Sequence, residues 1–201
     1  MNTAVFVSGG GTNLQAIIDN IKQGYLNKIN IAVVISSKPG VYAIERAKKE
    51  GIPFEVVSSR DFDSLEDYDS KLIKVLSGYK IELVVLAGFL SYLGTDFVNE
   101  YKGKIINVHP SLIPSFCGTG MYGIKPHVAA IDRGVKITGA TVHFVDGEYD
   151  NGPIILQHAV KVLDSDTPES LQNRVMEQAE QIILPKAIKL YSEGKIKIED
   201  K

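Results

Sequence analysis

Short apolar runs rich in β-branched residues alternate along the first half of the chain with segments of helical periodicity. Runs of this length that are apolar throughout are typical of parallel strands buried on both faces. They cover residues 3–7, 29–35, 54–57, 83–87 and 105–108. Between them the pattern predicts a helix with an apolar face at Leu14, Ile17, Ile18, Ile21 and Tyr25, a helix over 41–50, and a helix capped by Ser64. This alternation predicts right-handed crossovers and a doubly wound, mostly parallel α/β sheet.

The second half of the chain has a different pattern. A loop rich in Gly, Pro and Ser precedes a short predicted helix over 125–133. Two longer strand-like runs, 136–145 and 153–162, are joined by turn residues and predict an antiparallel extension of the sheet. A long amphipathic helix begins at Thr167, and we expect Pro185 to kink or split it. No linker or repeat divides the sequence, so we expect one domain over residues 1–201.

Composition narrows the class of protein. The 201 residues carry a formal net charge of −2 and no clustered basic run, so a nucleic-acid partner is not expected. The single cysteine, Cys117, allows no internal disulfide and suits a reducing compartment. No apolar run approaches the roughly 18 residues of a membrane helix, and the first residues lack the pattern of a signal peptide. We therefore expect a cytoplasmic protein that binds no membrane.

An amide and an imidazole stand two residues apart at the end of the fifth predicted strand. Alternate side chains of a strand share a face, so Asn107 and His109 point the same way. Pro110 cannot continue the ladder, which puts the pair at the carboxyl edge where ligands bind to open parallel sheets. Two such donors suit a reaction that builds negative charge on a carbonyl oxygen. The alternative is that Asn107 and His109 only make hydrogen bonds to the backbone of a loop and have no catalytic role.

A run of glycines joins the first predicted strand to the first helix. Ser8-Gly9-Gly10-Gly11-Thr12-Asn13 leaves backbone N–H groups free to approach an anion at a helix N-terminus. The alternative is a plain tight turn. The spacing matches neither a triphosphate loop nor a dinucleotide fingerprint, and Ser36-Ser37-Lys38 stands where a dinucleotide fold needs an acid for the ribose. A phosphosugar is therefore favoured over NAD or ATP.

Asp150 lies in the turn between the two later strands. Turns favour Asp for backbone reasons alone. The functional interpretation is that its carboxylate folds back toward His109 and raises the imidazole pKa. A metal site is not expected, because the histidines at 109, 127, 143 and 158 lack ligand spacing. We interpret His143 and His158 as ordinary strand residues, and Cys117 as a cysteine without a base beside it.

Five segments carry a family resemblance. They read Val-Ser-Gly-Gly-Gly-Thr-Asn-Leu-Gln-Ala-Ile over 7–17, Leu-Ala-Gly-Phe-Leu over 86–90, Asn-Val-His-Pro-Ser-Leu-Ile-Pro over 107–114, Thr-Val-His-Phe-Val over 141–145 and Asp-Asn-Gly-Pro-Ile-Ile-Leu-Gln over 150–157. The third and fifth are shared among folate-dependent formyltransferases. With the first segment and the short chain, they resemble the phosphoribosylglycinamide formyltransferases of purine synthesis nearly end to end. The resemblance implies a Rossmann-like formyltransferase fold.

The resemblance implies a reaction and a set of site residues. A formyl group would pass from 10-formyltetrahydrofolate, a co-substrate, to the amine of 5-phosphoribosylglycinamide by direct attack. Asn107 and His109 would stabilise the oxyanion, and Asp150 would keep His109 charged. The remaining implied contacts are Gly11, Thr12 and Asn13 for the phosphate, Glu180 for the glycinamide, and Leu90, Ser91, Tyr92, Leu93, Asn107 and Leu65 for folate.

The same resemblance implies a division of the chain. Residues 1–108 would form the phosphoribosyl-binding half and 109–201 the folate and catalytic half. The loop near 115–125 would line the folate site, and 145–150 would close it. The expected partners are small-molecule substrates alone, with no metal, and the protein would be a monomer or a homodimer.

The sequence departs from the family at four places. Ser91 and Leu65 stand where many members carry a cation that can meet an acidic folate tail. Thr138 occupies a position that is often His, and the segment 117–127 is a few residues longer than usual. Two alternatives remain. One is a folate-dependent hydrolase that releases formate with the same Asn107, His109 and Asp150, and the other is a non-catalytic phosphosugar sensor. Known hydrolases carry an additional amino-terminal domain, for which we expect no room before residue 8.

Overall fold

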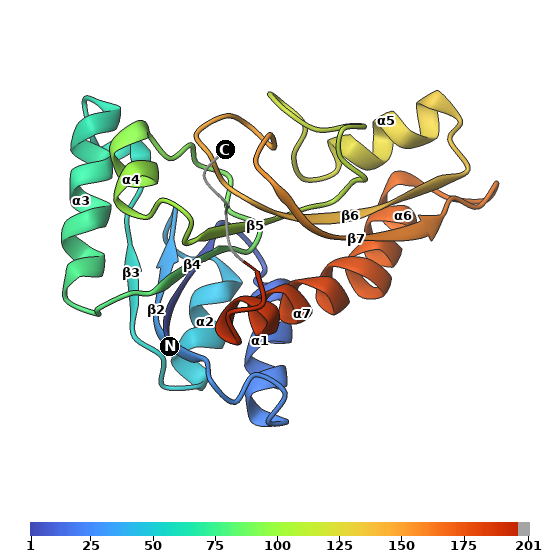
Figure 1. Ribbon diagram of the computed structural model, residues 1–201. Helices are drawn as coiled ribbons and strands as arrows, with labels where there is room; N and C mark the ends of the chain where they lie inside the picture. Colours follow the sequence, from blue (N-terminus) through green and yellow to red (C-terminus); the bar gives the residue numbers. More distant parts are fainter. Residues whose placement is uncertain (197–201) are drawn as a thin grey trace.

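The apolar runs form a seven-stranded sheet in the computed structural model, which describes residues 1–196 (Figure 1). The strand order is β3-β2-β1-β4-β5-β6-β7. Strands β1 to β5 pair in parallel, whereas β6 is antiparallel to β5 and β7 is antiparallel to β6. The strands are β1 (Asn2–Val7), β2 (Asn30–Ser36), β3 (Phe54–Val56), β4 (Leu83–Leu86), β5 (Ile105–His109), β6 (Ile137–Phe144) and β7 (Ile154–Lys161). The doubly wound sheet with an antiparallel extension is thus confirmed.

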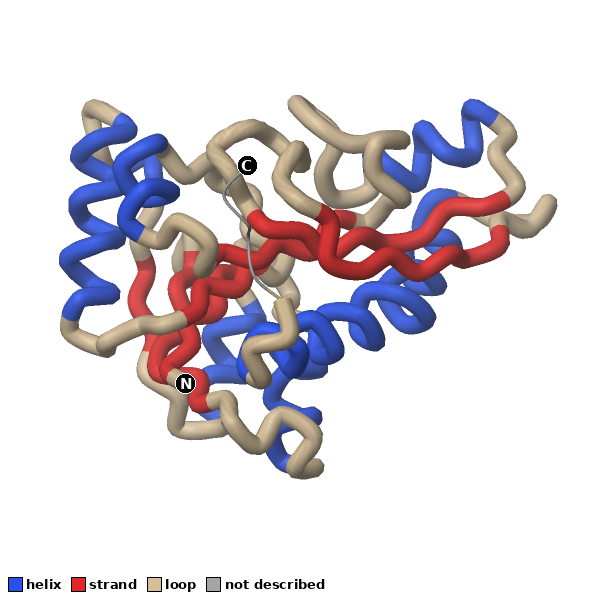
Figure 2. Tube along the Cα trace, in the orientation of Figure 1, coloured by secondary structure: helices blue, strands red, loops and turns tan. Residues whose placement is uncertain are grey.

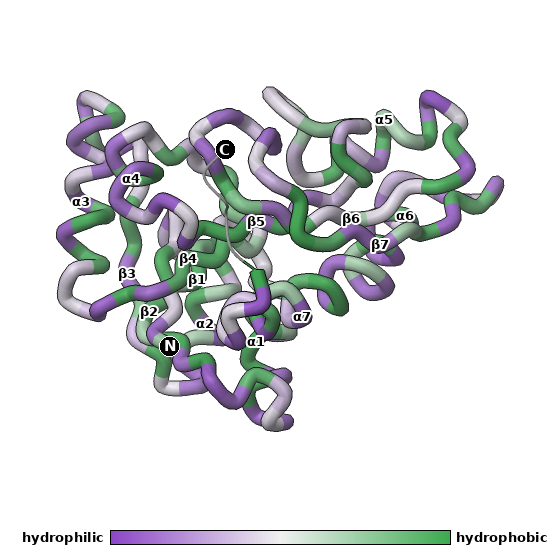
Figure 3. The backbone as a smooth tube through the Cα atoms, in the orientation of Figure 1, coloured by the Kyte–Doolittle hydropathy of each residue, from purple (hydrophilic) through white to green (hydrophobic). Residues whose placement is uncertain are grey.

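Helices cover both faces of this sheet (Figure 2). They are α1 (Thr12–Lys22), α2 (Tyr42–Lys49), α3 (Leu65–Ser77), α4 (Thr95–Glu100), α5 (Lys125–Arg133), α6 (Pro168–Val175) and α7 (Gln181–Ser192), with a 3₁₀ turn η1 (Ser59–Asp61) and a π-helical turn η2 (Met176–Glu180). Successive strand residues point to opposite faces. Val5 and Val7 pack with α1, α2, α6 and α7, whereas Ala4 and Phe6 pack with α3 and α4. The apolar strands lie between these two layers (Figure 3).

Three local details differ from the sequence prediction. Helix α1 ends at Lys22, so Tyr25 lies beyond it and is partly exposed. Strand β3 is an edge strand whose residues are not buried, although the apolar run predicts burial. Helix α4 was not predicted at all. Its first N–H groups are capped by the buried side chain of Asp69 in α3, which accepts from the Gly94 and Phe97 N–H groups at 2.9 and 3.1 Å, and such a tertiary contact leaves no local signal.

The long carboxyl-terminal helix is divided, but not at Pro185. The proline lies inside α7, and the change of helical form is the π-helical turn η2 that precedes α7. The wider turn of a π segment is rare and often accompanies a functional site. It ends at Glu180, which is buried. Among residues 1–196, no helix is long and apolar enough to span a bilayer.

Candidate active site

A cavity of about 500 Å³ opens at the carboxyl ends of β1, β4 and β5. The chain crosses from β1 to β2 on one side and reaches β4 on the other, so the strand order reverses between β1 and β4. Open α/β sheets bind their ligands at such a switch point. The lining residues come from the segments 8–13, 86–93, 107–110 and 118–123, from β6 and the β6–β7 loop, and from α5, α6 and η2.

All but one of the predicted site residues line this cavity. The structure brings together Gly11, Thr12, Asn13, Leu90, Ser91, Tyr92, Leu93, Asn107, His109, Asp150 and Glu180. The exception is Leu65, which is not among the lining residues. It begins α3, where a Cβ added to Gly94 would lie 2.8 Å from its Cγ. Leu65 thus stays a predicted folate contact that lies outside the cavity lining, with its side chain exposed at the start of α3.

The glycine loop forms one end of the cavity. Gly11 is the N-cap of α1 and has a left-handed backbone with φ 71°. A Cβ at this position would lie 2.7 Å from the Cβ of Ala43, so only glycine fits between α1 and α2. Among the described residues, no group accepts a hydrogen bond from the N–H of Gly10, Gly11, Thr12 or Asn13. Free N–H groups at a helix N-terminus make an anion site.

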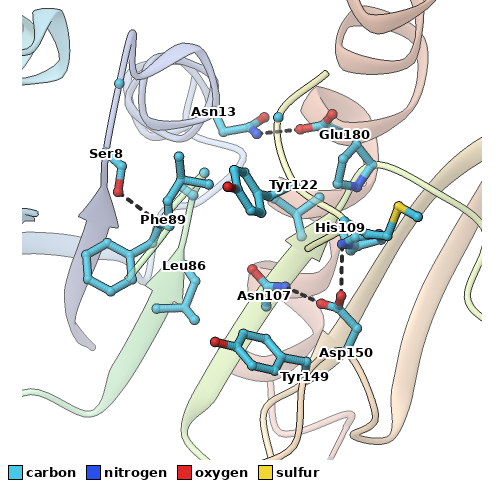
Figure 4. A pocket seen from close by; sticks show the side chains of 18 of the residues that line it. Ser8, Asn13, Leu86, Phe89, Asn107, His109, Tyr122, Tyr149, Asp150 and Glu180 are labelled. Atoms are coloured by element: carbon cyan, nitrogen blue, oxygen red, sulfur yellow. Dashed lines mark hydrogen bonds and ion pairs between the residues drawn. The ribbon is translucent and has the colours of Figure 1, made fainter. Parts of the chain in front are cut away.

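Glu180 reaches this end of the cavity from the π-helical turn (Figure 4). The Asn13 Nδ2 group donates to its Oε2 at 2.7 Å. Burial raises the pKa of Glu180 above its ordinary value, and the hydrogen bond from Asn13 only partly opposes this shift. The Oδ1 atom of Asn13 is buried and has no partner in the described part of the chain. A ligand that carries N–H groups would find two acceptors here.

His109 lies at the other end, between two hydrogen-bond acceptors. Its Nδ1 is 3.3 Å from Asp150 Oδ2, and its Nε2 is 2.9 Å from the carbonyl oxygen of Phe116. Only an imidazolium can donate to both at once. Burial nevertheless lowers the pKa of His109 below its ordinary value, although Asp150 and the Phe116 carbonyl act in the opposite direction. The predicted effect of Asp150 on the pKa of His109 is present, but burial outweighs it.

The Asp150 carboxylate lies against four groups, from β5, β6 and the loop that contains Gly118. Its Oδ2 accepts from the Gly118 N–H at 2.9 Å, and its Oδ1 lies 3.5 Å from Asn107 Nδ2. Burial opposes ionisation of this carboxyl, but the His143 and His109 rings and the Gly118 N–H outweigh it, so the pKa of Asp150 lies below its ordinary value. The backbone of Asp150 is left-handed, with φ 52°. The predicted contact between Asp150 and His109 is therefore present.

His143 fixes the orientation of Asn107. The two residues stand opposite each other in the antiparallel register of β5 and β6. His143 Nδ1 is 2.8 Å from the Phe144 carbonyl oxygen and donates to it, and its Nε2 lies 3.1 Å from Asn107 Nδ2 and 3.6 Å from Asp150 Oδ1. The interpretation of His143 as an ordinary strand residue missed this role. The signal was the pairing of β5 with β6, which the sequence pattern did not predict.

Two tyrosines join the loops at the folate side of the predicted site. The Tyr92 hydroxyl donates to the Gly147 carbonyl oxygen at 2.8 Å, and its ring centroid is 5.0 Å from that of Tyr149. The N–H of Leu90 donates to the Ser8 hydroxyl at 2.9 Å, which ties the loop after β4 to the end of β1. These contacts hold the β6–β7 loop, and with it Asp150, against the loop after β4.

His127 is a further lining residue that the sequence did not single out as functional. It lies at the start of α5 and is fully buried. Neither of its ring nitrogens has a hydrogen-bond partner among the described residues. Burial lowers the pKa of His127 to about 4, and His109 adds to the shift. Burial thus lowers the pKa of both His109 and His127.

Comparison with known proteins defines the class. Residues 1–188 match the formyl transferase family. The chain is 38% identical over 200 residues to phosphoribosylglycinamide formyltransferase of Escherichia coli (strain K12), covering 100% of this chain and 91% of that protein. The crystal structure of glycinamide ribonucleotide transformylase 1 from Symbiobacterium toebii superposes with a TM-score of 0.92 at 39% identity, covering 99% of this chain and 91% of that one.

Longer relatives contain the same unit. The trifunctional purine biosynthetic protein adenosine-3 of Chironomus tentans is 40% identical over 198 residues, which cover 98% of this chain but 14% of that protein. The chain belongs to the formyl transferase family, and within it to the phosphoribosylglycinamide formyltransferases.

Proposed function

We propose that this protein transfers a formyl group from 10-formyltetrahydrofolate to the amine of 5-phosphoribosylglycinamide in purine synthesis. One observation carries the proposal: a single cavity joins a glycine loop with free N–H groups to the Asn107–His109–Asp150 cluster. The first suits a ribosyl phosphate and the second suits formyl transfer. The family relationship supports the same assignment. The whole chain, 1–201, would act as one domain.

The substrate end would use groups of both halves of the chain. The N–H groups of Gly11, Thr12 and Asn13 would bind the phosphate. Glu180 and the Asn13 side chain would accept from the glycinamide nitrogens. Glu180 would thus bind this substrate although it belongs to the proposed folate and catalytic half, 109–201. Conversely, the proposed folate contacts Leu90, Ser91, Tyr92 and Leu93 belong to the proposed phosphoribosyl-binding half, 1–108.

The reaction needs no covalent intermediate between substrate and enzyme. The amine nitrogen would bond to the formyl carbon, the bond from that carbon to N10 of folate would break, and one proton would pass from the amine to N10. Negative charge that develops on the formyl oxygen would be stabilised by Asn107 Nδ2 and by His109. Asp150 would favour the protonated form of His109. No metal ion takes part in this proposal.

The resting contacts of His109 and Asn107 must change before they act. The Phe116 carbonyl oxygen occupies His109 Nε2, and His143 and Asp150 occupy Asn107 Nδ2. We infer that the formyl oxygen replaces the Phe116 carbonyl at His109 when the donor binds. Burial lowers the pKa of His109, so the exchange would proceed together with proton uptake.

A spectrophotometric assay with 10-formyltetrahydrofolate, run with and without the ribonucleotide, tests the proposal. We expect folate product only when the ribonucleotide is present. Equal turnover without it would indicate a folate-dependent hydrolase instead. No turnover in either case, from a folded protein that still binds ribose 5-phosphate, would indicate a phosphosugar sensor and would contradict the proposal.

A further inference from the structure

Helix α2 packs against the glycine loop, and none of its described residues lines the cavity. Arg46 of this helix donates from Nε to the Gly10 carbonyl oxygen at 2.8 Å. Its Nη1 donates to Gln15 Oε1, also at 2.8 Å, and its guanidinium lies 4.8 Å from the centroid of the Tyr42 ring. Arg46 is therefore fixed at three points behind the loop.

The same helix also holds the neighbouring peptide. The Ala43 N–H donates to the Gly9 carbonyl oxygen at 3.1 Å. In a trans peptide the C=O of one residue and the N–H of the next point in opposite directions. Because α2 holds the carbonyls of Gly9 and Gly10, the N–H groups of Gly10 and Gly11 point away from α2. The loop lines the cavity on that other side.

Without Arg46, little would keep the peptide between Gly10 and Gly11 in this orientation. Glycine tolerates backbone angles that other residues avoid, so a peptide flanked by two glycines can turn over at low cost. A reversed peptide would point the Gly10 carbonyl, rather than the Gly11 N–H, into the cavity. A carbonyl oxygen repels an anion, so the reversal would weaken phosphate binding.

The glycine loop has no basic side chain beside it in the lining of the cavity. Among the described residues that line the cavity, none is a lysine or an arginine. The charge of a phosphate would be met by backbone N–H groups and by the N-terminal dipole of α1. Arg46 places a full positive charge directly behind those N–H groups, close enough that its Cδ would lie 3.4 Å from a Cβ built on Gly11.

We propose that Arg46 is a positioning residue for the ribosyl-phosphate end of the site. It holds the Gly10 peptide so that the Gly11 N–H faces the phosphate, and it adds positive charge from behind the loop. The inference rests on the proposed function, since it assigns a phosphate ester to the glycine loop. Arg46 acts through the backbone and touches no substrate.

The test compares Arg46→Met with wild-type protein in two measurements. One is binding of ribose 5-phosphate by calorimetry, and the other is steady-state kinetics with the ribonucleotide and 10-formyltetrahydrofolate. We expect Arg46→Met to weaken ribose 5-phosphate binding and raise the KM for the ribonucleotide, each about tenfold, because a charge-assisted hydrogen bond is lost. The kcat and the KM for the folate should change by less than about twofold.

Two further variants separate this role from a general loss of charge or of folding. Lys49→Gln removes one exposed positive charge from the same helix and should leave both measurements unchanged. Arg46→Lys keeps the charge and one donor, so it should recover part of the affinity. If Arg46→Met does not fold, the comparison of Arg46→Lys with wild type carries the test, with a smaller expected rise in KM.

Amide spectra give a more direct measurement. In wild-type protein, ribose 5-phosphate should shift the Gly10 and Gly11 amide resonances, and Arg46→Met should reduce the Gly11 shift at saturating ligand. Suppose that the wild-type protein binds ribose 5-phosphate and turns over, but Arg46→Met has the same affinity and the same Gly11 shift. That result would overturn the role of Arg46 and leave the proposed function in place. Absence of binding and turnover in wild type would instead overturn the proposed function itself.

Discussion

At the glycine end of the cavity the ligand-facing groups are backbone N–H groups, whereas at the catalytic end they are the side chains of Asn107, His109 and Asp150. Regular elements hold the first end, because α1 begins in the loop and α2 braces it from behind. Strands β5 and β6 carry Asn107, His109 and His143 at the second end, but loops supply the Phe116 carbonyl and Asp150 that contact them. Under the proposed function, one site would combine a pre-formed binding end with a catalytic end whose hydrogen bonds must change before the reaction.

The largest effect is expected at the catalytic end. His109→Ala removes a donor to the reacting oxygen, and the loss of such an acid or oxyanion donor lowers turnover by roughly 10²- to 10⁴-fold. Asp150→Asn should act in the same direction, because it removes the charge that favours protonated His109. Kinetics together with ribose 5-phosphate binding should show reduced kcat and unchanged affinity. Near-normal kcat in either variant would contradict the assigned role.

The next effect is expected at the glycine end and should fall on affinity. Gly11→Ala forces a side chain into a left-handed conformation, at a cost of roughly 1–2 kcal/mol, and drives it against Ala43. Ribose 5-phosphate should bind about 10- to 100-fold more weakly, as measured by calorimetry. Gly24→Ala is the control, since Gly24 is also left-handed but has open space around it. Equal effects of the two variants on affinity would mean that strain alone, and not the loop, is being measured.

The pH dependence of stability tests the burial of His127, which lines the cavity near His109. An unfolded chain protonates His127 below its ordinary pKa of 6.5, whereas the folded chain does so only at a pKa of about 4. Acidification from about pH 7 to about pH 5 should therefore lower the free energy of unfolding of the wild type by roughly 2 kcal/mol more than that of His127→Leu. Urea unfolding at both pH values measures this difference. Equal losses in the two proteins would show that His127 is not buried in its neutral form.

The smallest effect is expected for the tyrosine contact between the loops. Tyr92→Phe keeps the ring against Tyr149 but removes the hydrogen bond to the Gly147 carbonyl, which is worth about 0.5–1.5 kcal/mol. The KM for the folate should rise about two- to tenfold, with a smaller fall in kcat, in steady-state kinetics. Tyr25→Phe, outside the cavity, should change neither constant. An unchanged folate KM in Tyr92→Phe would argue against a role for this contact.

The sequence was informative where the chemistry is local. The glycine loop, the Asn107–His109 spacing and the helix over 125–133 each depend on neighbouring residues, and the structure contains them as predicted. The cap of α3 by Ser64 is of the same kind, because its side chain accepts from the N–H three residues later. Strand alternation also placed the two cavity ends at one edge of the sheet.

Features that depend on contacts between distant segments were not predictable. Asp69 caps α4 across a gap in sequence, and His143 meets Asn107 only because β5 and β6 pair in antiparallel register. The Phe116 carbonyl leaves no sequence signal, since every residue has a carbonyl group. Leu65 is a different case, because family resemblance suggested it as a folate contact and it lies at the start of α3, outside the cavity lining.

The π-helical turn sets the rotational phase of the carboxyl-terminal helix. Before it, Leu171 and Val175 face the core, and after it Ile183 and Ala187 do the same. A π turn is equivalent to one residue inserted in an α-helix, and each residue of an α-helix turns the chain by about 100°. The insertion therefore lets Glu180 face Asn13 while both flanking helices keep their apolar sides on the sheet. Deleting one residue before Glu180 in this turn would rotate the two parts of the helix relative to each other by about 100°, so that either the Glu180 contact with Asn13 or the apolar packing of one part would be lost.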